Sequence, residues 1–305
     1  MRRYIVIRFG QAIIALIGVS ILVFVLTRAS GNLLDYILPL EASPEDYARA
    51  SEEWGLDKSL PMQYLTYAWN LLHGDFGHSW KWNTGALNLV LEKFPATLQL
   101  AGFTLAISSV MGLVFGVLVA TKKDTVFDYV GKVIALLGQS MPTFWTGIML
   151  MWLFAVILGW LPTSGKGGFQ HMILPGITLG WFNVAALMRL TRSAMLEELD
   201  EEYVKLARIK GLSEFKVVFK HCLRNAAIAP LTYFGVIAGF LMTGSVITET
   251  VFAWPGVGLL AVEAVRARDY QVVQAIVLFI AGIFIFCNLV VDILYAYLDP
   301  RIRYD

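Results

Sequence analysis

The sequence predicts an all-α polytopic membrane protein with six transmembrane helices. Of its 305 residues, 57% are hydrophobic and only 15% are charged, whereas ordinary soluble domains are about one quarter charged. The apolar residues gather in segments near the ~20 residues that one helix needs to cross a bilayer. These segments are residues 9–27, 98–120, 133–158, 173–190, 226–248 and 272–298.

The basic residues predict the orientation. Arg2, Arg3 and Arg8 stand at the start of the chain. The apolar segment after them is longer than a signal-peptide core and no A-x-A cleavage site follows, so we expect a retained helix. With the N-terminus in the cytoplasm, most of the 24 Lys and Arg residues lie on that side, as the positive-inside rule requires. Both termini are therefore expected in the cytoplasm, with a tail and first helix at 1–28, an extracytoplasmic loop at 29–96 and a five-helix core at 97–305.

The expected outer loop contains two helices and a turn. Ser43 and Pro44 are typical of an N-cap and a first helical position, so a helix is predicted over residues 43–54 and a second over 60–72. Residues 74–77 (GDFG) predict a turn. His73 and His78 flank that turn without a convergent ligand set, so a turn beside interfacial tryptophans is favoured over a metal site.

Residues 195–230 form the one long charged stretch of the chain. Two helical faces are expected there, with Gly211 at a helix C-cap and Ser213 capping the next helix. Either a solvated helix hairpin or a docking element for a cytoplasmic partner fits this pattern. The first face is Leu196, Leu199, Tyr203, Leu206 and Ile209, and the second is Phe215, Val218, Phe219, Cys222 and Leu223.

Two of the predicted spans carry polar residues near proline or small residues. Pro142 interrupts the third span, and the fifth ends in a run of small and polar residues. Such positions serve close packing in many helix bundles, and they also suit a water-filled path. The candidate pathway residues are Gln139, Ser140, Thr143, Thr243, Ser245 and Thr248.

The sequence shows no catalytic constellation. Residues 159–167 resemble a phosphate loop only faintly, because one intervening residue is too many and Gly167 replaces the Ser or Thr that would hold magnesium. The histidines are scattered, and Asp292 is the one ionisable residue expected inside a span. Ion-driven transporters usually need such groups within the membrane, so we expect the energy source to act through the charged stretch.

Residues 207–212 (ARIKGL), followed by 221–226 (HCLRNA) and Pro230, resemble the EAA loop of ABC-importer permeases. The chain resembles in particular the first permease subunit of the oligopeptide/dipeptide/nickel class, along nearly its whole length. Lys205 and Leu206 depart from the general EAA pattern, and Ser30-Gly31-Asn32 stands where the family often has Pro-Gly-Asp. The further matching motifs are residues 55–57, 61–64, 74–79, 95–98, 158–162, 174–175, 249–258, 268–270 and 298–301.

The resemblance implies a type I importer of a bacterial or archaeal cytoplasmic membrane. A second homologous permease subunit would complete the pathway, two cytoplasmic ATPase subunits would bind ATP and magnesium, and an extracytoplasmic binding protein would deliver substrate. This chain would then be no enzyme and hold no cofactor or metal. Within the EAA loop, residues 194–225, the stretch 207–215 would fit a groove on an ATPase through its small and apolar residues. The residues implied in coupling are Tyr203, Ala207, Arg208, Lys210, Gly211, Leu212 and Glu214.

The substrate implied by the resemblance is a di- or oligopeptide. An oligosaccharide, a nickel chelate or glutathione would keep the same mechanism, and an ion-gradient-driven secondary transporter is the alternative of another class. Aromatic residues of the first outer loop would contact either the binding protein or lipid headgroups, and headgroups are favoured for most of them. These aromatic residues are Trp54, Tyr64, Tyr67, Trp69, Trp80 and Trp82.

Overall fold

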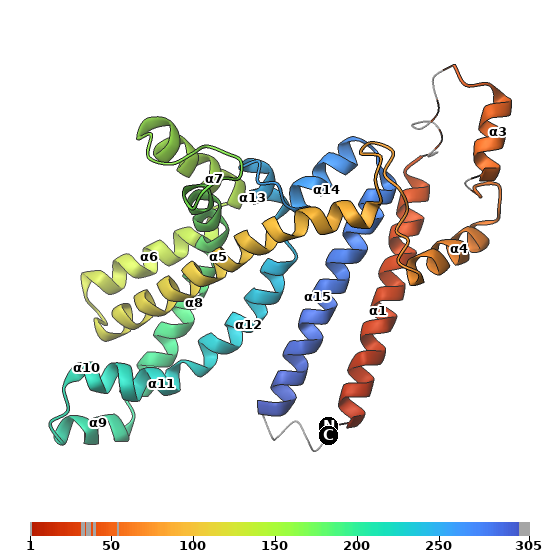
Figure 1. Cartoon of the computed structure of the whole chain (residues 1–305). Helices are drawn as coiled ribbons and strands as arrows, with labels where there is room; N and C mark the ends of the chain where they lie inside the picture. Colours follow the sequence, from red (N-terminus) through yellow and green to blue (C-terminus); the bar gives the residue numbers. More distant parts are fainter. Residues whose placement is uncertain (1, 32–33, 35–37, 39–40, 54, 299–305) are drawn as a thin grey trace. The chain divides into compact units, whose positions relative to one another are not determined.

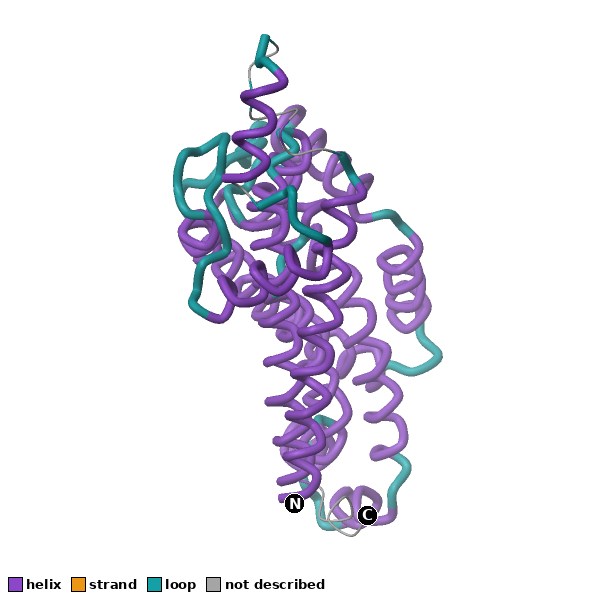
Figure 2. The backbone as a smooth tube through the Cα atoms, turned by 90° about the vertical axis from the view of Figure 1, so that its right-hand side faces the viewer, coloured by secondary structure: helices purple, strands orange, loops and turns teal. Residues whose placement is uncertain are grey.

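The computed structural model describes residues 2–31, 34, 38, 41–53 and 55–298, and within these ranges the chain is helical without a β-strand (Figure 2). An isolated bridge joins His78 and Gly85. Asn32, Asp35, Trp54 and the C-terminal motif residues Asp299, Pro300, Arg301 and Arg303 lie outside the described residues.

Four described helices are long and apolar enough to cross a membrane, and two bent helix pairs raise the number to six if each pair is one span. The predicted first, second, fourth and sixth spans correspond to single helices. The second and fourth are longer than expected, since one begins twelve residues earlier and the other continues into the charged stretch. The four helices are α1 (Arg2–Ala29), α5 (Ala86–Thr121), α8 (Gln170–Leu199) and α15 (Tyr270–Leu298).

The third expected span is not a continuous helix. It consists of α6 (Val126–Ser140), then α7 (Thr143–Met151) continued by the π-helix η1 (Trp152–Ile157), with a bend of 110° at the break. Met141 has an extended backbone, φ −85° and ψ 131°. The ring of Pro142 causes this, because a residue before proline is displaced from the helical region.

The fifth expected span is also divided. The second bent pair joins Glu214–Ala226 to α12 (Ile228–Met242) at an angle of 54°. α12 ends at Met242, and Gly244 with φ +83° separates it from α13 (Val246–Val251). The Ser245 hydroxyl accepts a hydrogen bond from the Thr248 amide and so caps α13. A glycine in the left-handed region followed by a serine N-cap ends one helix and starts another, so the apolar run 226–248 is not one helix.

By contact density the chain forms two compact units, which are residues 1–95 with 256–305, and residues 96–255. In the first unit α1 packs along α15 (Figure 1). The start of α5, α14 (Val257–Arg266) and α15 share a core that includes Val90, Leu260 and Ile276. α3 (Pro44–Glu53) and α4 (Leu60–Leu72) match the two predicted outer helices, and the Asp46 carboxylate accepts hydrogen bonds from the Ser43 amide and hydroxyl at the cap.

The second unit contains most of α5 and α8, the two divided spans and the charged stretch. α6 and α7 pack on α8, and α13 packs on both α7 and α8. Gly138 lies so close to α8 that a Cβ atom would come within 2.6 Å of the Trp181 ring, so glycine permits this helix crossing. The membrane-topology boundary predicted at residue 96 falls inside α5 and stays a prediction.

Candidate functional site

The charged stretch folds back against the ends of α5 and α8. After α8 it forms α9 (Glu202–Ile209), α10 (Glu214–Lys216), the π-helix η2 (Val217–Cys222) and α11 (Leu223–Ala226). Its inward residues share one core with Val117 and Ala120 of α5. The other buried members of this core are Met195, Val204, Ala207, Val217, Val218, Cys222 and Ala226.

The turn at Gly211 is a Schellman motif. The Gly211 amide donates to the Arg208 carbonyl at 2.9 Å, and the Leu212 amide donates to the Ala207 carbonyl at 3.2 Å. Gly211 has φ +76°, which costs an L-residue roughly 1–2 kcal/mol. The predicted helix end is thereby confirmed. Ser213 occupies the next N-cap, but its side chain makes no capping hydrogen bond.

The first helical face predicted from the sequence is wrong. α8 ends at Leu199 and α9 starts again at Glu202, so the face is divided between two helices. Val204 and Ala207 point into the core, while Leu206 and Ile209 are 55% and 80% exposed. In the second face Val218 and Cys222 are buried as expected, but Phe215 is 70% exposed and stacks against Phe219 with ring centroids 4.7 Å apart.

We name the exposed side chains Tyr203, Leu206, Ile209, Leu212, Phe215 and Phe219 the elbow surface. They surround the Gly211 turn, at which Arg208 pairs with Glu214, Nε to Oε1 2.8 Å. Lys210 is exposed and has no carboxylate partner among the described residues. The charged pair links α9 to α10, and the apolar side chains stay available to a partner.

Tyr203 fastens the elbow surface to the structure behind it. Its hydroxyl donates to the Glu198 carboxylate. The side-chain amide of Asn225 donates to that carboxylate and to the Tyr203 hydroxyl, each at 3.2 Å. Burial and the adjacent Glu198 carboxylate raise the pKa of Tyr203 to about 12. This network joins the end of α8, α9 and α11, a role that helical spacing alone did not indicate.

The candidate pathway residues lie at the two helix breaks of the second unit, α6/α7 and α12/α13. The Ser140 and Thr243 hydroxyls donate to the carbonyls of Leu136 and Phe240, while Thr248 is fully buried beside Ser245. Thr143 is the first residue of α7. Gln139 lines an open cavity of about 530 Å³ with Arg189, Ser193 and Tyr233. Their part in a pathway stays a prediction.

Three buried carboxylates were missed because each binds a partner that is distant in the sequence. In the second unit the Asp128 carboxylate accepts two 2.9 Å hydrogen bonds from the Arg192 guanidinium and lies 2.9 Å from the Lys132 Nζ. In the same unit the Glu249 carboxylate accepts a hydrogen bond from the Thr97 hydroxyl at 3.0 Å. In the first unit Asp269 accepts from the Ser79 hydroxyl at 2.6 Å. Two pairs of sequence motifs did give a signal for these sites, because the structure brings the two members of each pair together. The pairs are residues 95–98 with 249–258, and residues 74–79 with 268–270.

Among the described residues no group of three or more His, Cys, Asp or Glu side chains could hold a metal ion. Between two of its membrane spans the chain has an exposed apolar turn, the elbow surface, within the charged stretch. The family model described as "Binding-protein-dependent transport system inner membrane component" matches residues 112–304, which include that turn. The chain belongs to this family. It is a multi-pass permease subunit with the type I importer fold.

Named relatives cover the permease from end to end. It is 41% identical to the di/tripeptide transport system permease protein DppB of Pseudomonas aeruginosa, over 100% of both chains. It is 37% identical to the dipeptide transport system permease protein DppB of Escherichia coli K12, over 100% of this chain and 99% of that one. A putative peptide transport system permease protein of Brucella abortus is 40% identical over 98% of each chain.

Proposed function

We propose that this permease imports di- or oligopeptides as one half of a transmembrane pathway, driven by ATPase subunits that dock on the elbow surface. The exposed apolar turn around Gly211 carries the proposal. Leu206, Ile209 and Phe215 are each more than half exposed, although burying one such side chain contributes about 1.5–3 kcal/mol. A partner that covers them would obtain most of its affinity from this small area.

The geometry of the turn supports a narrower set of contact residues. Ala207 faces the core with Val204, so it supports the turn rather than touching a partner. Arg208 and Glu214 hold each other across the turn, and Lys210 remains for an acidic group on the ATPase. Because η2 and α11 continue towards α12, movement of the elbow surface would be transmitted to the fifth span and its break at Gly244.

The pathway and the partners follow from the same scheme. A second permease subunit would face the breaks at Pro142 and Gly244, where Gln139, Thr143 and Ser245 supply polar groups. ATP and magnesium would bind the ATPase subunits and not this chain. With both termini and residues 194–225 in the cytoplasm, the loop 29–96 would face the substrate-binding protein outside. Peptide is the proposed substrate because full-length relatives are named for peptide, dipeptide and di/tripeptide transport.

The proposal is tested by ATP turnover and peptide uptake in vesicles that contain the whole assembly. Gly211→Leu should abolish both stimulation by the peptide-loaded binding protein and uptake, while the permease still assembles in the membrane. No atom lies within 4 Å of a Cβ placed on Gly211, so the new side chain projects towards the partner. Gly165→Leu is the matched control, since Gly165 also has open space and has a similar positive φ of +81°.

Normal uptake by Gly211→Leu would refute docking at this turn. Stimulation only by a binding protein loaded with a sugar, a nickel chelate or glutathione would keep the mechanism and overturn the peptide assignment. Uptake that follows an ion gradient and ignores ATP would establish the secondary-transporter alternative.

A further inference from the structure

We infer that α4 is a membrane-interface helix whose apolar side is inserted among lipid acyl chains, at the leaflet where α1 ends. The helix contains no charged residue in its first or last turn, and none of its side chains is buried. Met62, Leu65, Trp69 and Leu72 are 52%, 61%, 65% and 82% exposed. Their spacing of three and four residues places them on one side of the helix.

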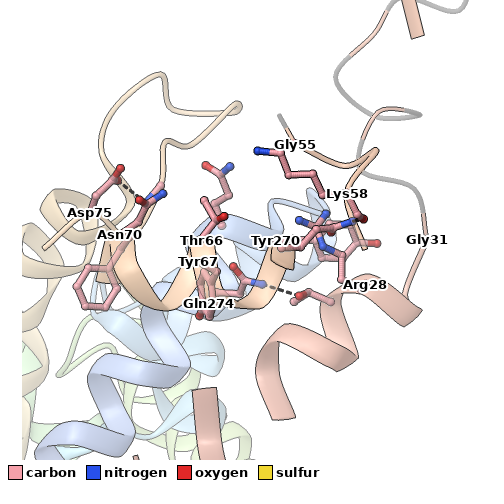
Figure 3. A pocket seen from close by; sticks show the side chains of 15 residues that line it. Arg28, Gly31, Gly55, Lys58, Thr66, Tyr67, Asn70, Asp75, Tyr270 and Gln274 are labelled. Carbon is pink, nitrogen blue, oxygen red and sulfur yellow. Dashed lines mark hydrogen bonds between the residues drawn. The ribbon is translucent and has the colours of Figure 1, made fainter. Parts of the chain in front are cut away.

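A second side of α4 carries polar groups. Gln63, Thr66, Tyr67 and Asn70 line a cavity of about 180 Å³ within the first unit. Figure 3 shows the last three around this cavity, with Asn70 beside Asp75. At 100° per residue, the centre of this polar side is more than a third of a turn from that of the apolar side. α4 is therefore amphipathic, with one side suited to water and the other to an apolar phase.

Contacts with α1 indicate how deep in the membrane α4 lies. The Tyr64 hydroxyl lies 2.9 Å from the Ser20 hydroxyl, and the rings of Tyr64 and Tyr67 lie 5.5 and 5.6 Å from that of Phe24. Ser20 and Phe24 belong to the candidate span Val6–Ala29. At 1.5 Å per residue they are about 13.5 and about 7.5 Å from its end at Ala29. Figure 1 shows α4 beside α1 below that end.

The depth of Phe24 is characteristic of interfacial helices, whose apolar side is buried about 5–10 Å into the boundary between headgroups and acyl chains. The Tyr64 side chain reaches deeper, to Ser20. Over the same length α1 exposes apolar side chains of its own, with Ile21, Leu22 and Val25 at 44%, 58% and 54%. Lipid that covers α1 there also reaches α4. The apolar side of α4 thus continues a surface that a bilayer must cover.

The charges nearby are placed as a headgroup layer requires. Arg28 is half-buried near the end of α1, packs over the Phe24 ring at 5.5 Å, and has no carboxylate partner among the described residues. Long basic side chains at helix ends reach the polar interface, and tryptophan prefers that layer. Trp69, stacked on His73 with ring centroids 4.5 Å apart, occupies such a position. A lipid surface explains the apolar stripe, the aromatic residues and Arg28 together.

Spin labels on single cysteines test this arrangement in the whole transporter, reconstituted in phosphatidylethanolamine–phosphatidylglycerol vesicles. Leu65→Cys and Leu72→Cys should give labels relaxed by oxygen several-fold more strongly than by a water-soluble nickel chelate. Thr66→Cys and Asn70→Cys on the polar side are the matched controls and should show the reverse order. Cys222 is buried and Cys287 lies in α15, so the parent protein measures the background.

Lipids brominated at known acyl positions supply a second measurement. A fluorophore at position 65 should be quenched by shallow bromines, and one at position 70 should not. Nickel-accessible labels at positions 65 and 72 in vesicles would overturn the inference. Accessible labels that become protected only when the binding protein is added would instead assign the stripe to that protein.

Discussion

The turn at Gly77 and the turn at Gly211 have the same left-handed backbone, with φ +85° and +76°, but opposite surroundings. At Gly211 no atom lies within 4 Å of the position a Cβ would take, whereas at Gly77 the Gln271 side chain lies 2.8 Å away. The side-chain carbonyl of Gln271 accepts a hydrogen bond from the His78 backbone amide. One turn is open to a partner, and the other is closed by its own chain.

Their carboxylates differ in the same way. Asp269 behind the Gly77 turn is fully buried, and it binds the Ser79 hydroxyl and the Val272 amide at the start of α15. Glu214 beside Gly211 is 65% exposed. Buried polar groups cost most when a partner is removed, and exposed pairs contribute little. The comparison separates a turn that stabilises its unit from a turn that presents a surface.

Removal of the buried carboxylate should give the largest effect. Asp269→Ala leaves the Ser79 hydroxyl and the start of α15 without their acceptor, so we expect a loss of about 3 kcal/mol in stability. The measurement is the temperature at which the detergent-solubilised assembly loses its monodisperse size-exclusion peak. Glu214→Ala is the matched control and should leave that temperature nearly unchanged. Equal shifts for the two variants would contradict the distinction.

Asparagine in place of each glycine should give an intermediate effect. Asn tolerates a positive φ better than other side chains, so Gly211→Asn should lower stability by under ~1 kcal/mol. Gly77→Asn should cost more, because its side chain must displace Gln271 from the His78 amide. The double variant Gly77→Asn, Gln271→Ala should recover part of the loss. Thermal midpoints that fall equally at both turns would show that the packing around Gly77 is unimportant.

The smallest effect is expected for the ion pair at the open turn. Arg208 and Glu214 are 42% and 65% exposed, and exposed pairs contribute about 0.2–1 kcal/mol. A double-mutant cycle with Arg208→Ala and Glu214→Ala should therefore give a small coupling energy that declines in high salt. The same thermal measurement tests it. A coupling energy as large as the Asp269 effect would mean that the pair sets the conformation of the turn.

Local patterns predicted many of the elements correctly. Ser43 and Pro44 mark the start of α3, and the predicted helix 60–72 agrees with α4. Gly211 marked a helix end because a left-handed residue closes a Schellman motif without a Cβ penalty. Pro142 marked the interruption of the third span. The sequence did not give its size, 110°, because a proline allows anything from a mild kink to a complete break.

The site was predicted less completely than the fold. Helical spacing suggested Tyr203, Leu206 and Ile209 as one face with Leu196, yet Val204 and Ala207 face the core. The reason is the restart of the helix at Glu202, which changes the phase of the apolar pattern. The hydrogen bonds of Tyr203 with Glu198 and Asn225 join residues on different helices, and spacing within one helix contains no information about them.

The sequence by itself determined the membrane class, the helical composition, the ends of the helices at Gly211 and Ser43, and the family resemblance. Each follows from composition, from a cap or from an ordered set of motifs, which act over a few residues. Tertiary structure alone decided that Ala207 faces inward, that Asp128 binds Arg192, that Asp269 binds Ser79, and that α4 lies against α1. These contacts join distant parts of the chain, so they depend on how helices pack and not on the residues next to them.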